Sequence, residues 1–313
     1  TSAFPAEYGN AVAGVFDLGF RNGNNKKRET TVQVGVITGL EATTEGPFSK
    51  NSDASYLVGY RYALAGVAQK LGVDIGTTAT PSYQDLSFKL NSGNFKFGKL
   101  SMFGILATSI INIGGGSSNT LYGNGNQVDF ASKIGLAGVN HFKQINSKSF
   151  VRSTFGVNYS STDQTGYSTD RATNADFVKE VNNVAKTSYN ISSVYNSKIN
   201  SRLFIKAGIR DEIIELNLFY KTKERINDSY NEIWDSKSNT NLAQAYAHMK
   251  YNLTEKLMLN AGVYAQLFFL NNSTSVEPRF GLIYNVPNNS SFNFGYGLHS
   301  QMQPINVYFL QSL

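Results

Sequence analysis

The chain has 313 residues, enough for one large domain or two small ones with a buried core. Charged residues make up only 16%, below the roughly 25% typical of soluble domains, which favours a large surface facing something other than water. The mean hydropathy of −0.26 and the lack of any apolar run of ~20 residues exclude a helical membrane protein. They do not exclude a β-barrel, whose strands are polar on one face.

The net charge of +6 is compatible with an acidic partner, but no dense run of Lys or Arg follows the short patch at 26–28. We interpret the charge as a surface excess spread over loops and turns, and we expect no nucleic-acid partner. The chain has no cysteine, which excludes disulfides, thiolate metal sites and thiol nucleophiles.

The first part of the chain predicts a short strand and then a meander. Asn22-Gly23 is a strong turn signal after the Gly-punctuated stretch 7–21. Segments 30–36, 40–48 and 54–62 then carry β-branched or aromatic residues at alternate positions, with Gly, Pro, Asn and Ser between them.

The same pattern continues to the end of the chain and predicts about thirteen strands. One exception is Ala175–Lys186, where apolar residues fall on one helical face and predict a short helix inside a loop. The further predicted strands cover 83–90, 97–111, 128–142, 150–160, 189–199, 203–220, 242–252, 257–269, 276–286 and 292–299.

Short and long connections alternate between these strands. Short turns are predicted near 47–51, 91–96, 146–149, 200–201, 253–256 and 287–290, and long loops near 64–81, 114–126, 161–186 and 222–240. This alternation is typical of outer-membrane barrels, in which the long loops lie outside the cell.

The strands also alternate between an apolar and a polar face. Val263 and Ala265 share the apolar face of their strand, while Asn260 and Gln266 share the polar one. Phe294 and Tyr296 likewise oppose Gly295, so we expect the apolar residues on the convex side and the polar ones on the concave side.

This pattern slips at Asp211, Glu212 and Glu215, where we expect a bulge or the membrane boundary. The predicted fold class is therefore all-β, an antiparallel up-and-down transmembrane β-barrel.

Several of these segments resemble a known family. Segments 6–10, 14–17 and 21–23 are similar to the end of the plug domain of a TonB-dependent outer-membrane receptor. Glu45-Gly46-Pro47-Phe48 and 56–61 resemble the first barrel strands of its Bacteroidetes members, and 275–282 and 295–304 provide a second match downstream.

The resemblance implies that 1–23 is the C-terminal end of the plug and that 24–313 is a partial barrel. Plugged barrels close with about 22 strands, so unpaired edges are expected at Thr30–Val36 and Phe292–His299. The implied function is energy-coupled uptake of a scarce nutrient, such as siderophore-bound iron, a vitamin or an oligosaccharide. The implied partners are outer-membrane lipid and the TonB energy-coupling complex, whose contact segment is expected before Thr1.

Candidate binding residues lie in the predicted long loops. Tyr122, Tyr167, Tyr230 and Trp234 could stack on a ligand, pack the loops, or sit at the headgroup level of a membrane. Arg61 and Arg279 fall on the polar face, where barrel charges pair with a plug or with neighbouring strands.

Nothing in the sequence predicts an enzyme, a cofactor or a metal site. The three histidines stand far apart, and Asp211, Glu212 and Glu215 fit a solvated strand end better than paired catalytic acids. A passive porin or a surface adhesin on the same scaffold is the alternative. A soluble β-sandwich enzyme or lectin would need clustered acids or a metal motif.

Overall fold

The protein was examined as a computed structural model. The structure describes residues 5–35, 39–50, 52–64, 80–113, 127–170, 172–287 and 290–309. Among these, the one helical element is the 3₁₀ turn η1 (Ile305–Phe309), and no helix is long and apolar enough to cross a membrane.

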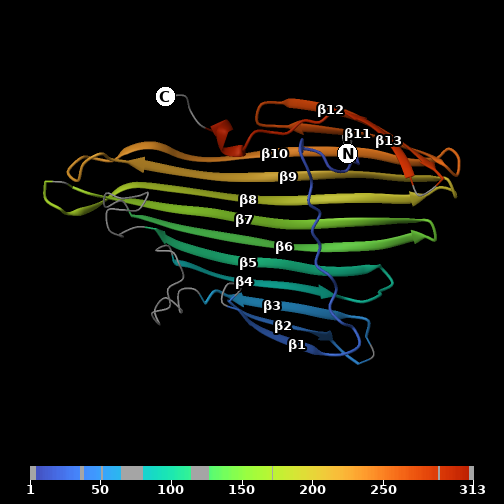
Figure 1. Cartoon of the computed structure of the whole chain (residues 1–313), viewed down its shortest axis with the longest axis horizontal. Coiled ribbons are helices and arrows are strands. Elements are labelled where there is room, and N and C mark those ends of the chain that lie inside the picture. The colour runs from blue at the N-terminus through green and yellow to red at the C-terminus, as the bar shows by residue number, and fades with distance from the viewer. Residues whose placement is uncertain are drawn as a thin grey trace.

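Thirteen strands form one antiparallel sheet in which each strand pairs with its neighbours in the chain (Figure 1). The up-and-down order and the predicted number of strands are thereby confirmed. The strands are β1 (Glu29–Gly35), β2 (Gly39–Pro47), β3 (Ser55–Tyr62), β4 (Thr80–Asn91), β5 (Lys99–Ile113), β6 (Val128–Asn146), β7 (Ser149–Thr169), β8 (Asp176–Lys198), β9 (Leu203–Thr222), β10 (Asn231–Asn252), β11 (Leu257–Phe268), β12 (Ser273–Val286) and β13 (Ser290–Gly297).

The two ends of the sheet differ. At the short-turn end, on the right in Figure 1, tight turns join alternate strand pairs from β2 to β11, at 48–54, 92–98, 147–148, 199–202 and 253–256. The opposite, long-loop end holds the connections 170–175 and 223–230, and the predicted loops 64–81 and 114–126 lie almost entirely outside the described residues. The predicted turns are therefore confirmed at the short-turn end.

The two faces of the sheet follow the predicted phase. We call the face that carries Tyr264 the inner face, because it lies against the N-terminal segment, and the opposite one the outer face. Tyr264 is 1% exposed, whereas its neighbour Val263 is 41% exposed and Phe294 is 63% exposed. Apolar side chains thus cover the outer face, as expected from the alternation.

On β9 the apolar outer face ends abruptly. The outward positions from 203 to 209 are apolar, Asp211 is the next outward residue, and Glu215 and Asn217 follow Ile213. The ten steps from 203 to 213 span about 34 Å at ~3.4 Å per residue, or roughly 25 Å of height at a tilt near 40°. An apolar band of that height would therefore contain Asp211 near its edge.

Of the two alternatives expected at Asp211, Glu212 and Glu215, the bulge is wrong. β9 pairs with both β8 and β10 through this region without a register shift. Instead the apolar side chains change face, and Ile214 and Leu218 are buried on the inner face. The acidic residues alternate too: Glu212 points inward to Lys186 and Arg210, while Glu215 points outward.

The helix expected at Ala175–Lys186 is also wrong, because these residues form the start of β8. Val178, Val181 and Val184 recur every third residue, which suggested a helical face, but valine favours strands and β7 and β9 supply pairing partners on both sides. Strand pairing also extends β7 to Thr169 and starts β10 at Asn231. The loops predicted at 161–186 and 222–240 are therefore reduced to the connections 170–175 and 223–230.

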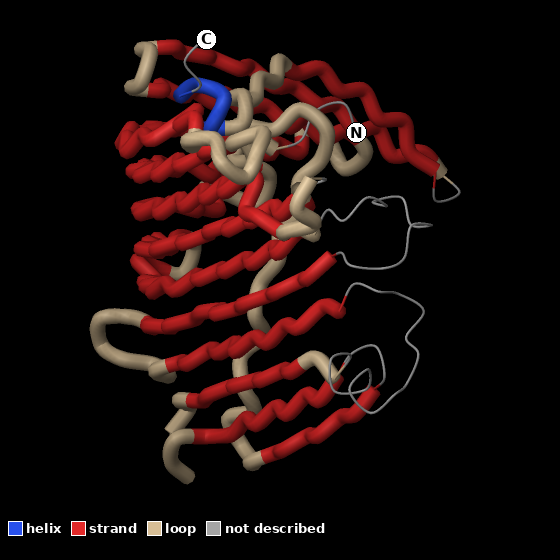
Figure 2. Tube along the Cα trace, turned by 90° about the vertical axis from the view of Figure 1, so that its left-hand side faces the viewer, coloured by secondary structure: helices blue, strands red, loops and turns tan. Residues whose placement is uncertain are grey.

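The sheet is curved, and β1 and β13 are its two edges (Figure 2). No pairing between β1 and β13 occurs in the described part of the chain, which agrees with the two unpaired edges that were expected. The N-terminal segment, residues 5–24, crosses the strands from the level of β10 down to β1 and β2 (Figure 1).

Candidate functional site

A buried ion pair on β12 is the centre of the candidate site. Arg279 Nη2 donates a hydrogen bond to Glu277 Oε2 at 2.7 Å, and the two side chains are only 3% and 2% exposed. Both residues occupy the inner face, since they lie two positions apart on one strand. Buried charges are costly unless they are paired and hydrogen-bonded, so the remaining contacts of this pair are important.

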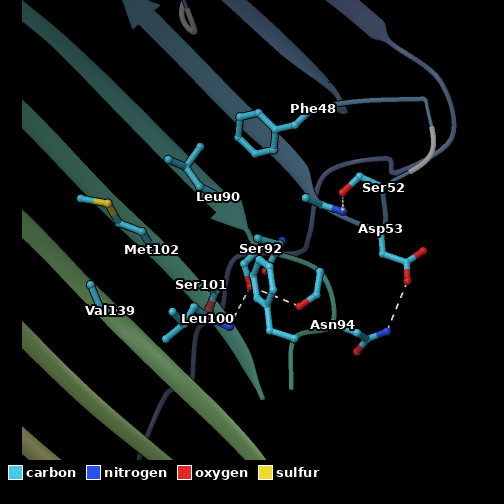
Figure 3. Close-up of a pocket in the computed structure, with 14 residues that line it drawn as sticks. Phe48, Ser52, Asp53, Leu90, Ser92, Asn94, Leu100, Ser101, Met102 and Val139 are labelled. Carbon is cyan, nitrogen blue, oxygen red and sulfur yellow. Dashed lines mark hydrogen bonds between the residues drawn. The ribbon is translucent and has the colours of Figure 1, made fainter. Parts of the chain in front are cut away.

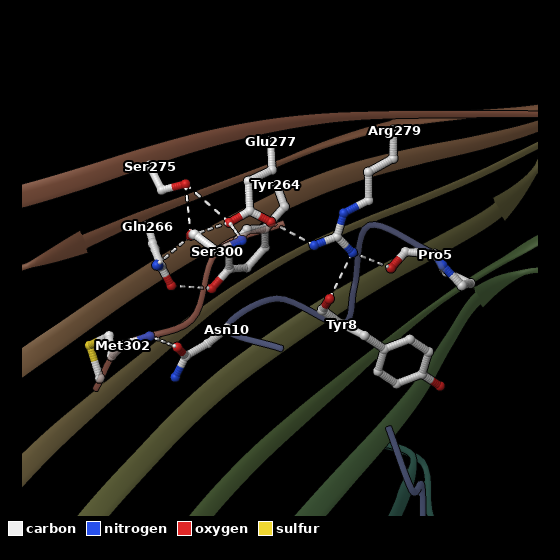
Figure 4. A network of polar contacts seen from close by, with 10 residues as sticks. All are labelled: Pro5, Tyr8, Asn10, Tyr264, Gln266, Ser275, Glu277, Arg279, Ser300 and Met302. Atoms are coloured by element: carbon white, nitrogen blue, oxygen red, sulfur yellow. Dashed lines mark hydrogen bonds and ion pairs between the residues drawn. The ribbon is translucent and has the colours of Figure 1, made fainter. Parts of the chain in front are cut away.

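The second arm of Arg279 reaches the N-terminal segment. Its Nη1 donates to the backbone oxygens of Pro5 at 2.9 Å and Tyr8 at 2.7 Å (Figure 4). A planar guanidinium can donate to Glu277 and to the segment at the same time, because its N–H donors point in several fixed directions. Arg279 therefore links the sheet to the segment that crosses it.

Glu277 is held by a chain of polar side chains. Its Oε1 accepts hydrogen bonds from Ser300 N at 3.0 Å, from Ser300 Oγ at 2.5 Å and from Ser275 Oγ at 3.0 Å. Gln266 Nε2 donates to Ser300 Oγ, and Tyr264 Oη donates to Gln266 Oε1. This network fixes the carboxylate in one orientation toward Arg279.

Shape complementarity adds to these polar contacts. Gly9 lies so close to Tyr264 that a Cβ there would meet ring atom Cζ at 1.8 Å. Ala6 is fully buried, and a Cβ built on Gly262 would lie 2.8 Å from its methyl group. The segment can pass this close to the sheet only because two of the contact positions are glycine.

Two more contacts complete the attachment of residues 5–10. Lys206 on β9 forms an ion pair with Glu7. Asn10, whose φ of 54° lies in the left-handed region, accepts a hydrogen bond from Met302 N at 2.7 Å. We call the residues 5–10 with these contacts the upper anchor.

The other end of the segment is attached by a more exposed pair. Arg21 donates two hydrogen bonds to the Glu45 carboxylate, at 2.6 and 2.7 Å, and Asn24 N donates a third at 2.7 Å. The bond to Glu45 raises the pKa of Arg21 above its usual value. Gly23 packs against the backbone of Tyr56, where a Cβ would meet the Tyr56 oxygen at 2.0 Å. We call this the lower anchor.

Between the anchors the segment is open to solvent. Phe16 is 93% exposed and Leu18 is 89% exposed. One contact links this stretch to the upper anchor, a hydrogen bond of 3.3 Å from Tyr8 Oη to Asp17 Oδ2. Burial, with the charges of Glu7 and Asp17, raises the pKa of Tyr8 above its ordinary value.

Arg61 does not take part in the anchors. It points to the inner face like Arg279, but the partners recorded for it are Asp85, at 2.7 Å, and the ring of Tyr83, whose centroid is 5.3 Å away. Arg61 and Arg279, which the sequence analysis placed on the same polar face, therefore have different partners: Arg61 contacts the neighbouring strand β4, and Arg279 contacts the N-terminal segment.

Two of the aromatics expected in long loops lie in strands near the long-loop end instead, Tyr167 in β7 and Trp234 in β10. Tyr230 lies in the connection 223–230, and Tyr122 falls outside the described residues. The hydroxyl of Tyr230 donates to Val178 O, and Trp234 stacks at 5.2 Å on Tyr220. Tyr167 is the pairing partner of Val178 and donates its hydroxyl to Asp129. Tyr167 and Tyr230 thus flank one stretch of β8.

Two lysines lie over the ring of Tyr230. Lys221 Nζ is 4.4 Å and Lys223 Nζ is 5.0 Å from its centroid, and Lys223 also lies 5.5 Å from the ring of Phe177. A cation above the face of an aromatic ring is attracted to that ring. This cluster therefore offers both positive charge and ring faces at the long-loop end. Among the described residues no group of three or more His, Asp or Glu could hold a metal ion.

Sequence reasoning missed most of the upper anchor. Glu7, Lys206 and Ser300 are ordinary polar residues far apart in the chain, and nothing local marks them as partners. Tyr264 carried a usable signal, because it is an aromatic residue between Gly262 and Gln266 on the face expected to be polar.

Solved structures share this fold. No family model and no curated protein matches the chain. The ferric-catecholate import receptor Fiu from E. coli K12 has a TM-score of 0.55 at 11% identity, over 88% of this chain and 53% of that one. The ferric enterobactin receptor PfeA from Pseudomonas aeruginosa has a TM-score of 0.62 at 12% identity, over 93% and 46%. The copper transporter OprC has a TM-score of 0.54 at 10% identity, over 79% and 42%.

At 10–12% sequence identity, these matches show only that the chain shares the fold of the three structures. The chain spans about half the length of the receptor structures it matches, and it has the architecture of part of their barrels. All three matched structures are named as receptors or transporters, which agrees with the family that the sequence resembles.

Proposed function

We propose that this chain is part of a TonB-dependent outer-membrane receptor that imports a scarce nutrient by an energy-coupled mechanism. The observation that carries the proposal is a segment anchored at both ends to the inner face of a curved, antiparallel sheet. In this proposal 1–23 is the end of a plug domain and 24–313 is part of the barrel.

The proposed location is the outer membrane. Exposed apolar side chains follow the outer face from β3 to β13, including Leu106, Phe155, Ile191, Val263 and Phe294. Soluble monomers rarely expose a continuous apolar patch of more than a few hundred Å². A surface of this kind is stable against lipid, and the outward polar residues Asp211, Glu215 and Asn217 of β9 mark where it would leave the membrane.

The proposed substrate is a small molecule or an oligosaccharide, bound at the long-loop end. Tyr167, Tyr230 and Trp234 present ring faces there, and Lys221 and Lys223 add positive charge. Siderophore-bound iron, a vitamin and a sugar chain all stack on aromatic rings, and the lysines favour the anionic members of this group.

The proposed transport step is a movement of residues 5–24 driven by the TonB complex. The segment lies across the inner face, so it narrows the lumen as long as both anchors hold. Release of one anchor would move the segment aside without unfolding the sheet, whose strands pair only with one another.

A reversible cross-link between segment and sheet tests this proposal. The chain has no cysteine, so the double variant E7C/K206C places two thiols at the positions of the Glu7–Lys206 ion pair, where a short bis-methanethiosulfonate reagent can join them through two disulfides. In a deletion strain the variant is assayed for uptake of iron–catecholate, cobalamin and maltooligosaccharide, before and after reduction, with E7C and K206C alone as controls.

We expect one of these substrates to be taken up by the wild type only when the energy-coupling complex is present. Uptake by the double variant should be lost when cross-linked and restored by reduction. Uptake that continues in a strain without the complex, and in the cross-linked variant, would identify a passive porin and overturn the proposal.

A further inference from the structure

Five of the six short connections at the short-turn end carry one basic residue each, and the sixth, between β12 and β13, carries none. Lys50, Lys96, Lys148, Arg202 and Lys256 occur roughly fifty residues apart in the sequence, so they do not form a run. The antiparallel sheet brings every second connection to the same end, and the five cations therefore form a row along one rim.

An exposed apolar residue accompanies each cation. Within three residues of the basic side chains lie Phe48, Phe95, Ile145, Ile199 and Leu253, which are between 38% and 59% exposed. Exposed apolar side chains do not stabilise a tight turn that is surrounded by water. Apolar or aromatic groups next to lysine or arginine are typical of chains that sit at the headgroup level of a membrane, where long basic side chains reach the polar layer.

These cations are available to a ligand. All five are exposed, and within the described residues none of them takes part in an ion pair. Two acidic residues, Asp53 and Glu255, lie in the same turns, so five cations and two acids leave these turns with a net charge of +3. At the long-loop end Lys179 pairs with Glu224. The short-turn end thus presents an excess of cations that no ion pair neutralises in the part of the chain that the structure describes.

A hollow opens beside two of these turns (Figure 3). Its volume is about 720 Å³, and its apolar part is lined by Leu90, Met102 and Val139 of the outer face. Phe48 and Phe95, next to Lys50 and Lys96, stand at its mouth. The rim is polar, with Asn94 Nδ2 donating to Asp53 Oδ2 at 3.3 Å.

We propose that the short-turn end binds anionic glycerophospholipids, with phosphate groups on the row of cations and one acyl chain entering the hollow. The inference rests on the proposed placement of the outer face in a membrane. Charge complementarity selects an anionic headgroup, because basic residues near an anionic membrane surface are attracted to it. The apolar floor beside a polar rim suits a molecule that has a charged head and a hydrocarbon tail.

Lipid enrichment around the protein tests the proposal. The full protein, purified in detergent, is reconstituted into nanodiscs made from equal parts phosphatidylglycerol and phosphatidylcholine. It is then re-extracted, and the retained lipid is identified by native mass spectrometry. The test variant is K50Q/K96Q/K148Q/R202Q/K256Q. The control K179Q/K221Q/K223Q/R225Q/K237Q removes the same number and kind of charges from the long-loop end.

We expect the wild type and the control to retain phosphatidylglycerol about tenfold in preference to phosphatidylcholine, and the test variant to lose that preference. V139F, which fills the hollow while leaving the cations in place, should retain one phosphatidylglycerol fewer. Equal retention of both lipids by the wild type, an unchanged preference in the test variant, or an equal loss in the control would each overturn the proposal.

The outcome is independent of the transport proposal. A protein that is absent from outer-membrane fractions contradicts the proposed function itself. A protein that resides there and imports substrate, yet shows no preference for phosphatidylglycerol, contradicts the lipid site alone.

Discussion

The upper and lower anchors hold the same segment by different means. The upper anchor uses the buried Arg279, which Glu277 on the same strand holds in place while Arg279 donates to the Pro5 and Tyr8 oxygens, and it adds close packing at Gly9. The lower anchor uses the pair Arg21–Glu45 between segment and sheet, in which the arginine side chain is 61% exposed. Water screens the Arg21–Glu45 pair, whereas the contacts of Arg279 are shielded from water. We infer that the lower anchor releases first.

The largest effect is expected for Arg279→Ala. The substitution leaves the Glu277 carboxylate buried without its cation, which costs about 3–5 kcal/mol of stability. It also frees the Pro5 and Tyr8 oxygens. Denaturant unfolding in detergent should show the loss, and limited proteolysis should cut residues 5–23 faster. The double variant R279A/E277Q should recover part of the stability, and no recovery would contradict the buried-charge explanation.

Gly9→Ala should detach the upper anchor while leaving its charges in place. The new methyl group overlaps the Tyr264 ring, and overpacking of this kind costs about 1–3 kcal/mol. Hydrogen exchange should rise for residues 5–10 and stay unchanged for the β11–β12 pairing. Gly14→Ala is the matched control, since a Cβ there meets nothing within 4 Å.

Glu45→Gln should have a smaller effect, below about 1 kcal/mol, because exposed ion pairs contribute little. Hydrogen exchange is expected to rise for residues 21–24 alone. If residues 5–10 loosened as well, the two anchors would be coupled and the comparison above would fail.

The smallest effect is expected at alkaline pH. The pKa of Tyr8 is raised in the folded chain, so its contribution to stability is complete below the ordinary tyrosine pKa near ~10 and is lost as pH rises through the raised value. The pKa of Arg21 is raised as well, from a much higher starting value, so the lower anchor keeps its charge. Tyrosinate absorbance, compared between wild type and Tyr8→Phe, measures the shift.

Much of the fold was predictable, because it depends on local patterns. Alternation at Val263–Gln266 and tight turns such as 253–256 need only neighbouring residues to be recognised, and the sheet follows from pairing consecutive strands. The prediction failed at Val178–Val184, where apolar residues at every third position suggested a helix. The stretch is a strand because it pairs with both β7 and β9.

The candidate site was predictable only in part. Arg279 could be placed on the inner face from its strand, but its partners Pro5 and Tyr8 lie more than 270 residues away in the sequence. Lys206 and Glu7 are separated by 199 residues, and neither belongs to a recognisable motif. Contacts of this range depend on the path of the N-terminal segment across the whole sheet, which no local signal contains.

This long separation has a consequence for the order of assembly. Every strand finds its partner in the adjacent hairpin, so the sheet can grow one hairpin at a time as the chain is made. Residues 5–10 precede β1 in the chain, whereas their partners lie on β12 and at Met302. The upper anchor can therefore close only after β12 has joined the sheet.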